Sequence, residues 1–282
     1  MTDSILVCTD LDGTLLPNGN CPESAQARTI FSALAKHPEI VLTYVTGRHK
    51  ALVEQAIAEY SLPQPDFVIG DVGTSIYTLT AGVWQAWPQW AEEIAPDWQG
   101  REHADMQQLF AHLPDLVLQE NAKQNRFKLS YYVSLDTDIP QLLEAMRGRL
   151  AQYAIRAELV YSVDEAEKNG LLDVLPASAT KFHAICFLMQ HLGFTVENTV
   201  FAGDSGNDLL VLTSAIKSVV VANASPDIKK EAVQLAQLQS TGPALYLAKG
   251  GFMGMNGNYS AGILEGLAHF LPCTQQWMKT DE

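Results

Sequence analysis

The chain has 282 residues, of which 47% are hydrophobic, enough for one large core or for a core with a smaller second domain. Its formal net charge of −14, from 18 basic and 32 acidic residues, argues against a surface that binds nucleic acid or anionic lipid. Four widely spaced cysteines (Cys8, Cys21, Cys186 and Cys273) form no disulfide pattern, and no apolar run reaches the roughly 18 residues of a membrane span. We therefore expect a cytoplasmic protein without an export signal and without a nucleic-acid or membrane partner.

Short apolar runs alternate with helical patterns along most of the chain. Buried strands are predicted at residues 4–10, 39–47, 66–73, 198–204 and 218–223. Apolar residues at helical spacing predict helices at residues 24–37, 48–60 and 179–193. This alternation is typical of an α/β fold, with a Rossmann-like parallel sheet covered by helices on both faces.

The middle of the chain has a different pattern. Trp and Pro cluster in residues 84–100 before a helix around 103–112, which predicts a domain boundary near residue 85. Further strands are predicted at 126–135, 155–163 and 171–176, and an amphipathic helix at 139–153. We therefore predict a discontinuous core, residues 1–85 and 177–282, interrupted by a small α+β domain at residues 86–176.

Two acidic side chains follow the first predicted strand, in the sequence DLDGT. Asp10 ends the strand and Asp12 lies two residues later, and carboxylates this close repel each other unless a cation lies between them or one is protonated. Open parallel sheets place their ligand sites beyond the carboxyl ends of the strands. A bound Mg²⁺, which prefers oxygen ligands, would remove the repulsion. The alternative is an ordinary turn at a strand end, where Asp is common.

A second acidic pair follows the strand predicted at 198–204. In the sequence GDSGND, Asp204 would add a third carboxylate to the same sheet edge, and Asp208 a fourth. Asp208 could instead be the N-cap of the following helix, with Gly206 in the turn, and both roles can hold together. Helix capping does not explain Asp204.

Two further features could hold an anion. Thr46 ends a predicted strand and is followed by Gly47 at the start of a helix, where backbone N–H groups lack internal partners. Lys181, near the start of a later helix, could reach a phosphate oxygen. Taken singly, each feature is more often an ordinary turn or a surface lysine.

Together, DxDGT, the Thr-Gly pair, the lysine and GDxxxD follow the order of the haloacid dehalogenase superfamily, which the chain resembles over its whole length. The inserted domain matches the α/β cap of one subgroup of sugar-phosphate phosphatases. Within that subgroup the chain is most similar to the sucrose-phosphate phosphatases, through VGTSIY (72–77), QNRFKLSYYV (124–133), GLLDVLP (170–176), GDSGND (203–208) and SAGILEGLAHF (260–270). It departs from them at Thr180-Lys181-Phe182, where the relatives tend to read Asn-Lys-Gly.

The resemblance implies a Mg²⁺-dependent phosphatase. In such an enzyme Asp10 attacks phosphorus, and Asp12 protonates the leaving sugar oxygen and then activates the hydrolytic water. Mg²⁺ would be held by Asp10, the backbone carbonyl of Asp12 and Asp204, with Asp208 ordering a metal-bound water. The remaining motif residues would hold or orient the phosphoryl group: Thr46, Gly47, Lys181 and Asn207.

On the same resemblance, the cap would recognise the sugar, because the core offers little surface specific for it. The predicted contacts to sugar hydroxyls are polar residues near Phe127 and Tyr131: Gln124, Asn125, Lys128 and Asp173. These side chains could equally be ordinary polar groups on a strand face. The loop at 164–170 could line the sugar pocket, and the glycine-rich segment 250–260 is predicted to be a flexible loop rather than a phosphate cradle.

The leading hypothesis is hydrolysis of sucrose 6-phosphate, with a glycosyltransferase as the partner that supplies the substrate. Alternatives within enzymes are a phosphatase for mannosylfructose phosphate or a glycosylglycerate phosphate, and a phosphosugar mutase with the same nucleophile. A different class is a non-catalytic sugar-phosphate sensor or a partner subunit of a glycosyltransferase. A pure binding protein would have no physical need for an acid at Asp12.

Overall fold

The computed structural model describes residues 4–164 and 167–278, and the chain divides into two compact units. The first unit combines the chain up to Ala86 with the chain from Lys181 onward. The second unit, which we call the cap, is a single insertion spanning Trp87–Thr180. The sequence placed the end of the insertion at Pro176, where the last cap strand ends, whereas the compact unit continues to Thr180.

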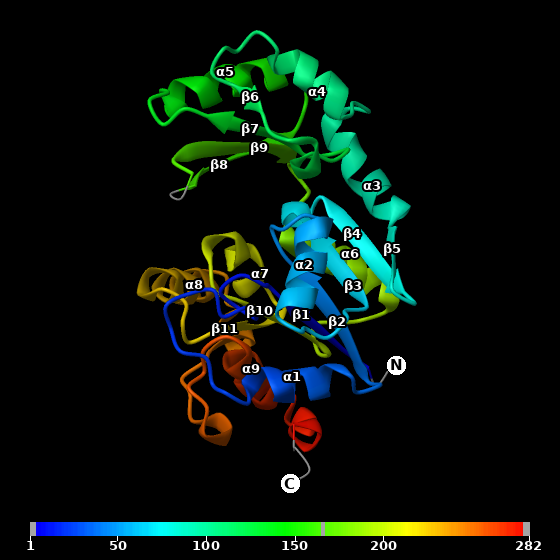
Figure 1. Cartoon of the computed structure of the whole chain (residues 1–282), viewed down its shortest axis with the longest axis vertical. Coiled ribbons are helices and arrows are strands. Elements are labelled where there is room, and N and C mark those ends of the chain that lie inside the picture. The colour runs from blue at the N-terminus through cyan, green and yellow to red at the C-terminus, as the bar shows by residue number, and fades with distance from the viewer. Residues whose placement is uncertain (1–3, 165–166, 279–282) are drawn as a thin grey trace. The chain divides into compact units, whose positions relative to one another are not determined.

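The first unit is built on an eight-stranded sheet with the strand order β12-β11-β10-β1-β2-β3-β4-β5 (Figure 1). Its strands are β1 (Ile5–Thr9), β2 (Ile40–Val45), β3 (Phe67–Gly70), β4 (Ser75–Thr80), β5 (Val83–Ala86), β10 (Thr199–Gly203), β11 (Lys217–Val220) and β12 (Leu245–Leu247). Neighbours from β12 to β3 are parallel, and β4 and β5 add to the sheet as antiparallel strands. All residues of β1 are buried, as expected for a central strand that is covered on both faces.

Helices cover both faces of this sheet. Helices α1 (Ala27–Ala35), α2 (Lys50–Glu59) and α9 (Ser260–Phe270) share one hydrophobic core with β1 and β2, and α1 lies beside α9. Helices α6 (Lys181–Leu192), α7 (Leu209–Leu212) and α8 (Pro226–Leu238) belong to the other layer, in which α7 packs against α6 and α8. The predicted α/β fold is therefore confirmed.

The cap is a two-layer α+β domain. Its antiparallel sheet has the order β6-β7-β9-β8, formed by β6 (Val117–Leu118), β7 (Leu129–Val133), β8 (Ala157–Asp164) and β9 (Asn169–Pro176). Its helices are α3 (Pro88–Ile94), α4 (His103–Phe110) and α5 (Ile139–Gln152), of which α4 packs on β7 and on α5 (Figure 1). Successive side chains of a strand point to opposite faces, so Ser130 and Tyr132 lie on the opposite face of β7 from Leu129, Tyr131 and Val133.

Short 3-10 helices complete the described chain: η1 (Asp71–Gly73), η2 (Ala95–Trp98), η3 (Asn121–Lys123), η4 (Gly206–Asp208), η5 (Gly242–Ala244), η6 (Phe252–Gly254) and η7 (Pro272–Trp277). The hairpin β4–β5 was not predicted, because the Trp- and Pro-rich sequence around it was interpreted as a domain junction. In the structure its aromatic side chains pack on each other, with Tyr77 and Trp84 ring centroids 5.7 Å apart. Within residues 4–164 and 167–278, no helix is both long enough and apolar enough to cross a membrane.

Candidate active site

Three of the predicted carboxylates meet at the carboxyl ends of β1 and β10. These strands are parallel neighbours with Thr9 opposite Ala202, so Asp10 and Asp204 follow adjacent strand ends. Asp10, Asp204 and Asp208 each place a carboxylate oxygen within 4.8 Å of the others, and Asp10 and Asp208 are buried. An all-oxygen cluster of this kind suits a hard divalent cation.

The cluster is electrostatically strained without a cation. Burial raises the pKa of Asp10 to about 8; Lys181 lowers it, and the charges of Asp208 and Asp204 raise it further. Burial also raises the pKa of Asp204 to about 6, against a lowering hydrogen bond from Thr14. A positive ion at this position would favour the ionised form of both carboxylates.

Lys181 is the buried cation of the site, with only 3% of its surface exposed. Its Nζ lies 2.8 Å from Asp208 Oδ1, 3.2 Å from Asp10 Oδ2 and 3.0 Å from Asn207 Oδ1. Burial disfavours the charged amine, but the carboxylates of Asp208 and Asp10 outweigh it, so the pKa of Lys181 is raised. The structure thus places Lys181 beside the nucleophile candidate Asp10, and Asn207 beside Lys181.

Asp208 uses both carboxylate oxygens inside the site. Oδ1 accepts from Lys181, whereas Oδ2 accepts the backbone N–H groups of Asp204 and Ser205 at 3.1 and 3.2 Å. The side chain that caps η4 is that of Ser205, and Asp208 completes a reciprocal capping box as the third helical residue. Asp208 also occupies the N-cap position of the following helix, α7, as the capping alternative predicted, but its side chain makes no capping hydrogen bond there.

The DGT turn fits closely against Asp204. Gly13 has φ +73°, and a Cβ built there would lie 2.4 Å from Asp204 Oδ2. The hydroxyl of Thr14 donates to Asp204 Oδ1 at 2.7 Å. Only glycine leaves room for the Asp204 carboxylate at this point, so the turn is shaped around the acidic cluster.

Asp12 lies outside the acidic cluster and has partners that the sequence reasoning missed. Its carboxylate accepts Arg48 Nε at 2.8 Å and Arg48 Nη2 at 2.6 Å. It also accepts Asn18 Nδ2 at 2.6 Å, while the Asn18 Oδ1 accepts the Gly13 N–H at 2.7 Å. Arg48 lies directly after the Thr-Gly pair, and that position was the one available signal for it.

The Thr-Gly pair lies at the end of β2, next to β1 in the sheet. Thr46 is buried; its backbone N–H donates to Ile69, its carbonyl accepts from Val72, and its Oγ1 accepts the Arg48 N–H at 3.2 Å. Gly47 is exposed, and a Cβ there would meet only Val72, at 3.8 Å. Val72 has φ +60°, unusual for a β-branched residue, and such outliers cluster at functional sites.

The predicted sugar contacts in the cap have different surroundings. The Gln124 amide donates to the carbonyls of Gln119 and Ser130 and accepts the Ser130 N–H, so it links β7 to the segment after β6. These contacts favour a structural role for Gln124. The Asn125 Oδ1 accepts the backbone N–H of Phe127 at 2.8 Å, which stabilises the turn before β7.

Lys128 and Asp173 form a pair on the cap sheet. Lys128 is 8% exposed, with Nζ 3.6 Å from Asp173 Oδ2, and the Ser130 hydroxyl donates to Asp173 Oδ1 at 2.5 Å. Their contact with a sugar stays a prediction.

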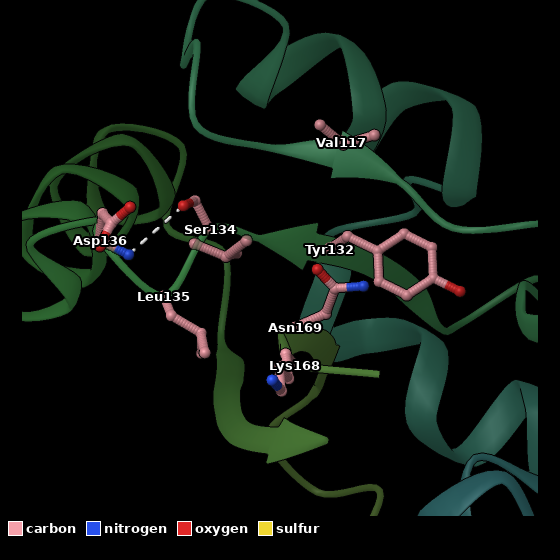
Figure 2. A pocket seen from close by; sticks show the side chains of 8 residues that line it. Val117, Tyr132, Ser134, Leu135, Asp136, Lys168 and Asn169 are labelled. Carbon is pink, nitrogen blue, oxygen red and sulfur yellow. Dashed lines mark hydrogen bonds between the residues drawn. The ribbon is translucent and has the colours of Figure 1, made fainter. Parts of the chain in front are cut away.

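A pocket of about 650 Å³ lies within the cap, beside the first residue of β6, the end of β7 and the start of β9. Figure 2 shows the side chains that line it. The side chains that line it include Val117, Tyr132, Ser134, Leu135, Asp136, Lys168 and Asn169. Two of them, Lys168 and Asn169, come from the loop predicted at 164–170, of which Glu165 and Ala166 lie outside the described residues. An aromatic ring, aliphatic groups and several hydrogen-bonding groups therefore line the same pocket.

Comparison with known proteins identifies the family. Residues 3–271 match the family model described as sucrose-6F-phosphate phosphohydrolase. The chain belongs to this family. The predicted resemblance to haloacid dehalogenase phosphatases of the sucrose-phosphatase subgroup is thereby confirmed, and this family member is a hydrolase of phosphoric monoesters.

Individual relatives agree with the family assignment. The chain is 52% identical to a haloacid-dehalogenase-like hydrolase of Nitrosococcus oceani over 99% of its own length and 75% of that protein. It is 29% identical to the mannosylfructose-phosphate phosphatase of Agrobacterium fabrum, over 94% of this chain and 96% of the relative. In structure it is similar to the sucrose-phosphatase of Synechocystis, solved with sucrose and phosphate, with a TM-score of 0.67, 24% identity and coverage of 95% and 98% of the two chains. At this identity the structural likeness establishes the fold.

Proposed function

We propose that this family member hydrolyses sucrose 6-phosphate to sucrose and phosphate, with Mg²⁺, through a phosphoaspartate on Asp10. The observation that carries the proposal is the position of Lys181, whose buried Nζ lies between Asp10 and Asp208 beside the carboxylate of Asp204. A carboxylate attacks an anionic phosphate only where positive charge neutralises both. Lys181 supplies one such charge, and the acidic cluster provides ligands for the other.

The Mg²⁺ would be held by Asp10, Asp204 and the backbone carbonyl of Asp12. Asp208 would order a water molecule next to the ion. Three converging carboxylates and a glycine that leaves space for Asp204 fit a hard cation with oxygen ligands. When bound, the ion reduces the repulsion between the Asp10 carboxylate and the phosphate and favours ionised Asp10.

The reaction would proceed in two displacements. An Asp10 oxygen attacks phosphorus and the bond to the sugar oxygen breaks, while Asp12 donates its proton to that oxygen. Water then attacks phosphorus, Asp12 takes the proton, and the Asp10 carboxylate is released together with phosphate. The transferring oxygens are held by the backbone and side chains around the nucleophile: Thr46, Gly47 and Lys181, with Asn207 orienting Lys181.

The cap would recognise the sugar. The family description and the likeness to sucrose-phosphatases support sucrose 6-phosphate as the substrate. The pocket at Tyr132 and Asn169 offers a ring face and polar groups, a combination that suits sugar rings. Mannosylfructose phosphate is the second candidate, because the Agrobacterium relative matches nearly end to end.

Two further parts of the proposal concern context. A glycosyltransferase is the expected source of the substrate; in line with this, the chain is 30% identical over 79% of its length to part of a glucosylglycerol-phosphate synthase of Pseudomonas anguilliseptica. We place the protein in the cytoplasm, which is compatible with Cys8, Cys21, Cys186 and Cys273 all being unbridged.

The test is phosphate release from a panel of sucrose 6-phosphate, mannosylfructose phosphate, glucosylglycerol phosphate and glucose 6-phosphate, with Mg²⁺ or with EDTA. Asp10→Asn is compared with Asp227→Asn, which changes an exposed acid in the first turn of α8. We expect the highest kcat/KM for sucrose 6-phosphate, and loss of activity with EDTA and in D10N but not in D227N. A higher kcat/KM for another ester would reject the substrate, and normal turnover by D10N would reject the mechanism.

A further inference from the structure

The glycine-rich segment at residues 249–259 is anchored by hydrogen bonds to other parts of the first unit. At its start, the buried carboxylate of Glu265 in α9 accepts the N–H groups of Lys249 and Gly250 at 2.8 and 2.9 Å. The same carboxylate accepts the hydroxyl of Tyr246 at 2.8 Å. A carboxylate with three donors in a buried setting fixes the backbone that supplies them.

Further along, the segment binds the chain that follows the nucleophile turn. The side-chain amides of Asn256 and Asn258 both donate to the carbonyl of Pro22, at 2.8 and 2.9 Å. The backbone N–H of Asn256 donates to the hydroxyl of Ser24 at 3.0 Å. The segment therefore holds Pro22 and Ser24, which follow the DLDGT turn after the intervening residues 15–21.

Asn223, in the turn between β11 and α8, connects the end of this segment to the nucleophile turn. Its Nδ2 donates to the carbonyl of Gly13 at 2.6 Å, and its Oδ1 accepts the backbone N–H of Tyr259 at 2.8 Å. Tyr259 is fully buried, with φ 51° and ψ −133°. Residues other than glycine rarely adopt this backbone conformation. Asn223 thus links two backbone segments, at Gly13 and Tyr259, that are far apart in sequence.

Gly13 is the point on which these contacts converge. Its N–H is held by Asn18, its carbonyl by Asn223, and its Cα lies against the Asp204 carboxylate. The peptide bond between Asp12 and Gly13 contains the Asp12 carbonyl, which is a proposed metal ligand. A displacement of Gly13 would therefore move this carbonyl together with the Asp12 side chain, the proposed acid.

We propose that Asn223 is a positioning residue of the active site, and that the 249–259 segment anchors it by fixing Tyr259 and residues 22–24. The inference rests on the proposed function, because it assigns Asn223 a role in placing Asp12 and the DGT turn. Asn223 touches no reacting group; it acts through the Gly13 carbonyl.

Asn223→Asp is the sharp test, since it keeps the acceptor for Tyr259 and replaces the donor to Gly13 by an oxygen. The matched control is Asn198→Asp. Asn198 also links two backbone segments, but at the start of β1 and β10, away from the site. Its Nδ2 donates to the Ser4 carbonyl at 3.1 Å, and its Oδ1 accepts the backbone N–H of Thr195 at 2.8 Å. Hydrolysis of p-nitrophenyl phosphate and calorimetric titration with Mg²⁺ alone are measured for both variants.

We expect N223D to lower kcat by about tenfold and to weaken Mg²⁺ binding several-fold, with KM changed by less than about threefold. N198D should keep kcat and Mg²⁺ affinity and lose only thermal stability. Equal effects of the two variants on kcat and on Mg²⁺ affinity would overturn the proposal. If wild-type protein releases no phosphate, the proposed function fails, while the difference in Mg²⁺ affinity still tests the role of Asn223.

A second variant tests the role of the 249–259 segment even if N223D does not fold. Asn256→Ala combined with Asn258→Ala removes the contacts to Pro22 at positions that are exposed and half-buried. We expect a loss of about threefold in kcat and in Mg²⁺ affinity at an unchanged melting temperature. Wild-type values for both quantities would show that the segment does not support the nucleophile turn.

Discussion

The carboxylate of Asp12 and the guanidinium of Arg48 form a two-point ion pair, with Nε 2.8 Å from Oδ2 and Nη2 2.6 Å from Oδ1. A pair of parallel hydrogen bonds fixes the plane of a carboxylate as well as its position. Both side chains are partly exposed, so the pair adds little to stability. The pair instead fixes the orientation of the Asp12 carboxylate, the proposed acid and base.

Replacing Arg48 should therefore affect catalysis more than folding. We expect Arg48→Ala to lower kcat by about 10- to 100-fold, because a misplaced proton donor slows both displacements. Arg48→Lys should be intermediate, since lysine makes only one contact. Arg126→Ala is the control, because Arg126 forms an exposed ion pair with Glu102 in the cap, at 2.7 Å. Steady-state kinetics with equal kcat in R48A and R126A would contradict this role.

Gly13 offers a test of the space around Asp204. In Gly13→Ala the new methyl would lie 2.4 Å from Asp204 Oδ2, which forces the carboxylate away. We expect Mg²⁺ affinity to fall by about 10- to 100-fold in calorimetric titration. Gly82→Ala is the matched control: it has a similar φ of +77° but no atom within 4 Å of the added Cβ. It should lose only about 1 kcal/mol of stability. Equal Mg²⁺ affinity in both variants would refute the role of the turn.

The buried Asp10 predicts an unusual dependence of stability on pH. Its pKa is raised to about 8 by burial, so without a divalent cation the native state keeps a proton that the unfolded chain loses near pH 4. The contribution of this group to stability is therefore present below about pH 4 and is lost as the pH rises toward about 8. In EDTA, the melting temperature of Asp10→Asn should exceed that of wild type at pH 8, and the gap should shrink toward pH 5. A gap independent of pH would contradict the assignment.

Cap variants should separate sugar recognition from phosphate chemistry. Removing the charge in Lys128→Met should raise KM for the preferred sugar phosphate about tenfold, through the lost hydrogen bond to a hydroxyl. The KM for p-nitrophenyl phosphate, which has no sugar, should stay the same. Arg126→Met is the control, because Arg126 pairs with exposed Glu102 at 2.7 Å. Parallel changes for both substrates would mean that Lys128 does not contact the sugar.

The sequence was most informative where a buried strand ends. Asp10 and Asp204 were placed on one sheet edge because parallel strands align their carboxyl ends, and the structure has them there. The β4–β5 hairpin escaped prediction because the Trp- and Pro-rich sequence around it was interpreted as a domain junction, and because its strands lack a regular alternation of buried and exposed residues.

Side-chain direction was less accessible. Arg48 follows the Thr-Gly pair, but no local pattern tells whether a residue at a helix start points to solvent or to Asp12. Gln124 was interpreted as a sugar contact from its polarity, whereas its partners Gln119 and Ser130 depend on how β6 and β7 pair. Contacts between segments far apart in sequence, such as Asn223 with Gly13, need the folded chain.

The central claim is that Asp10 forms a covalent bond to phosphorus during turnover. It is tested most directly by quenching the reaction of wild-type enzyme, Mg²⁺ and sucrose 6-phosphate in acid, followed by borohydride reduction and mass spectrometry of the peptides. Reduction of an aspartyl phosphate yields homoserine, so we predict homoserine at position 10 only when substrate and Mg²⁺ are both present. Phosphate release at full rate with unmodified Asp10, or with homoserine at a different aspartate, would contradict the mechanism.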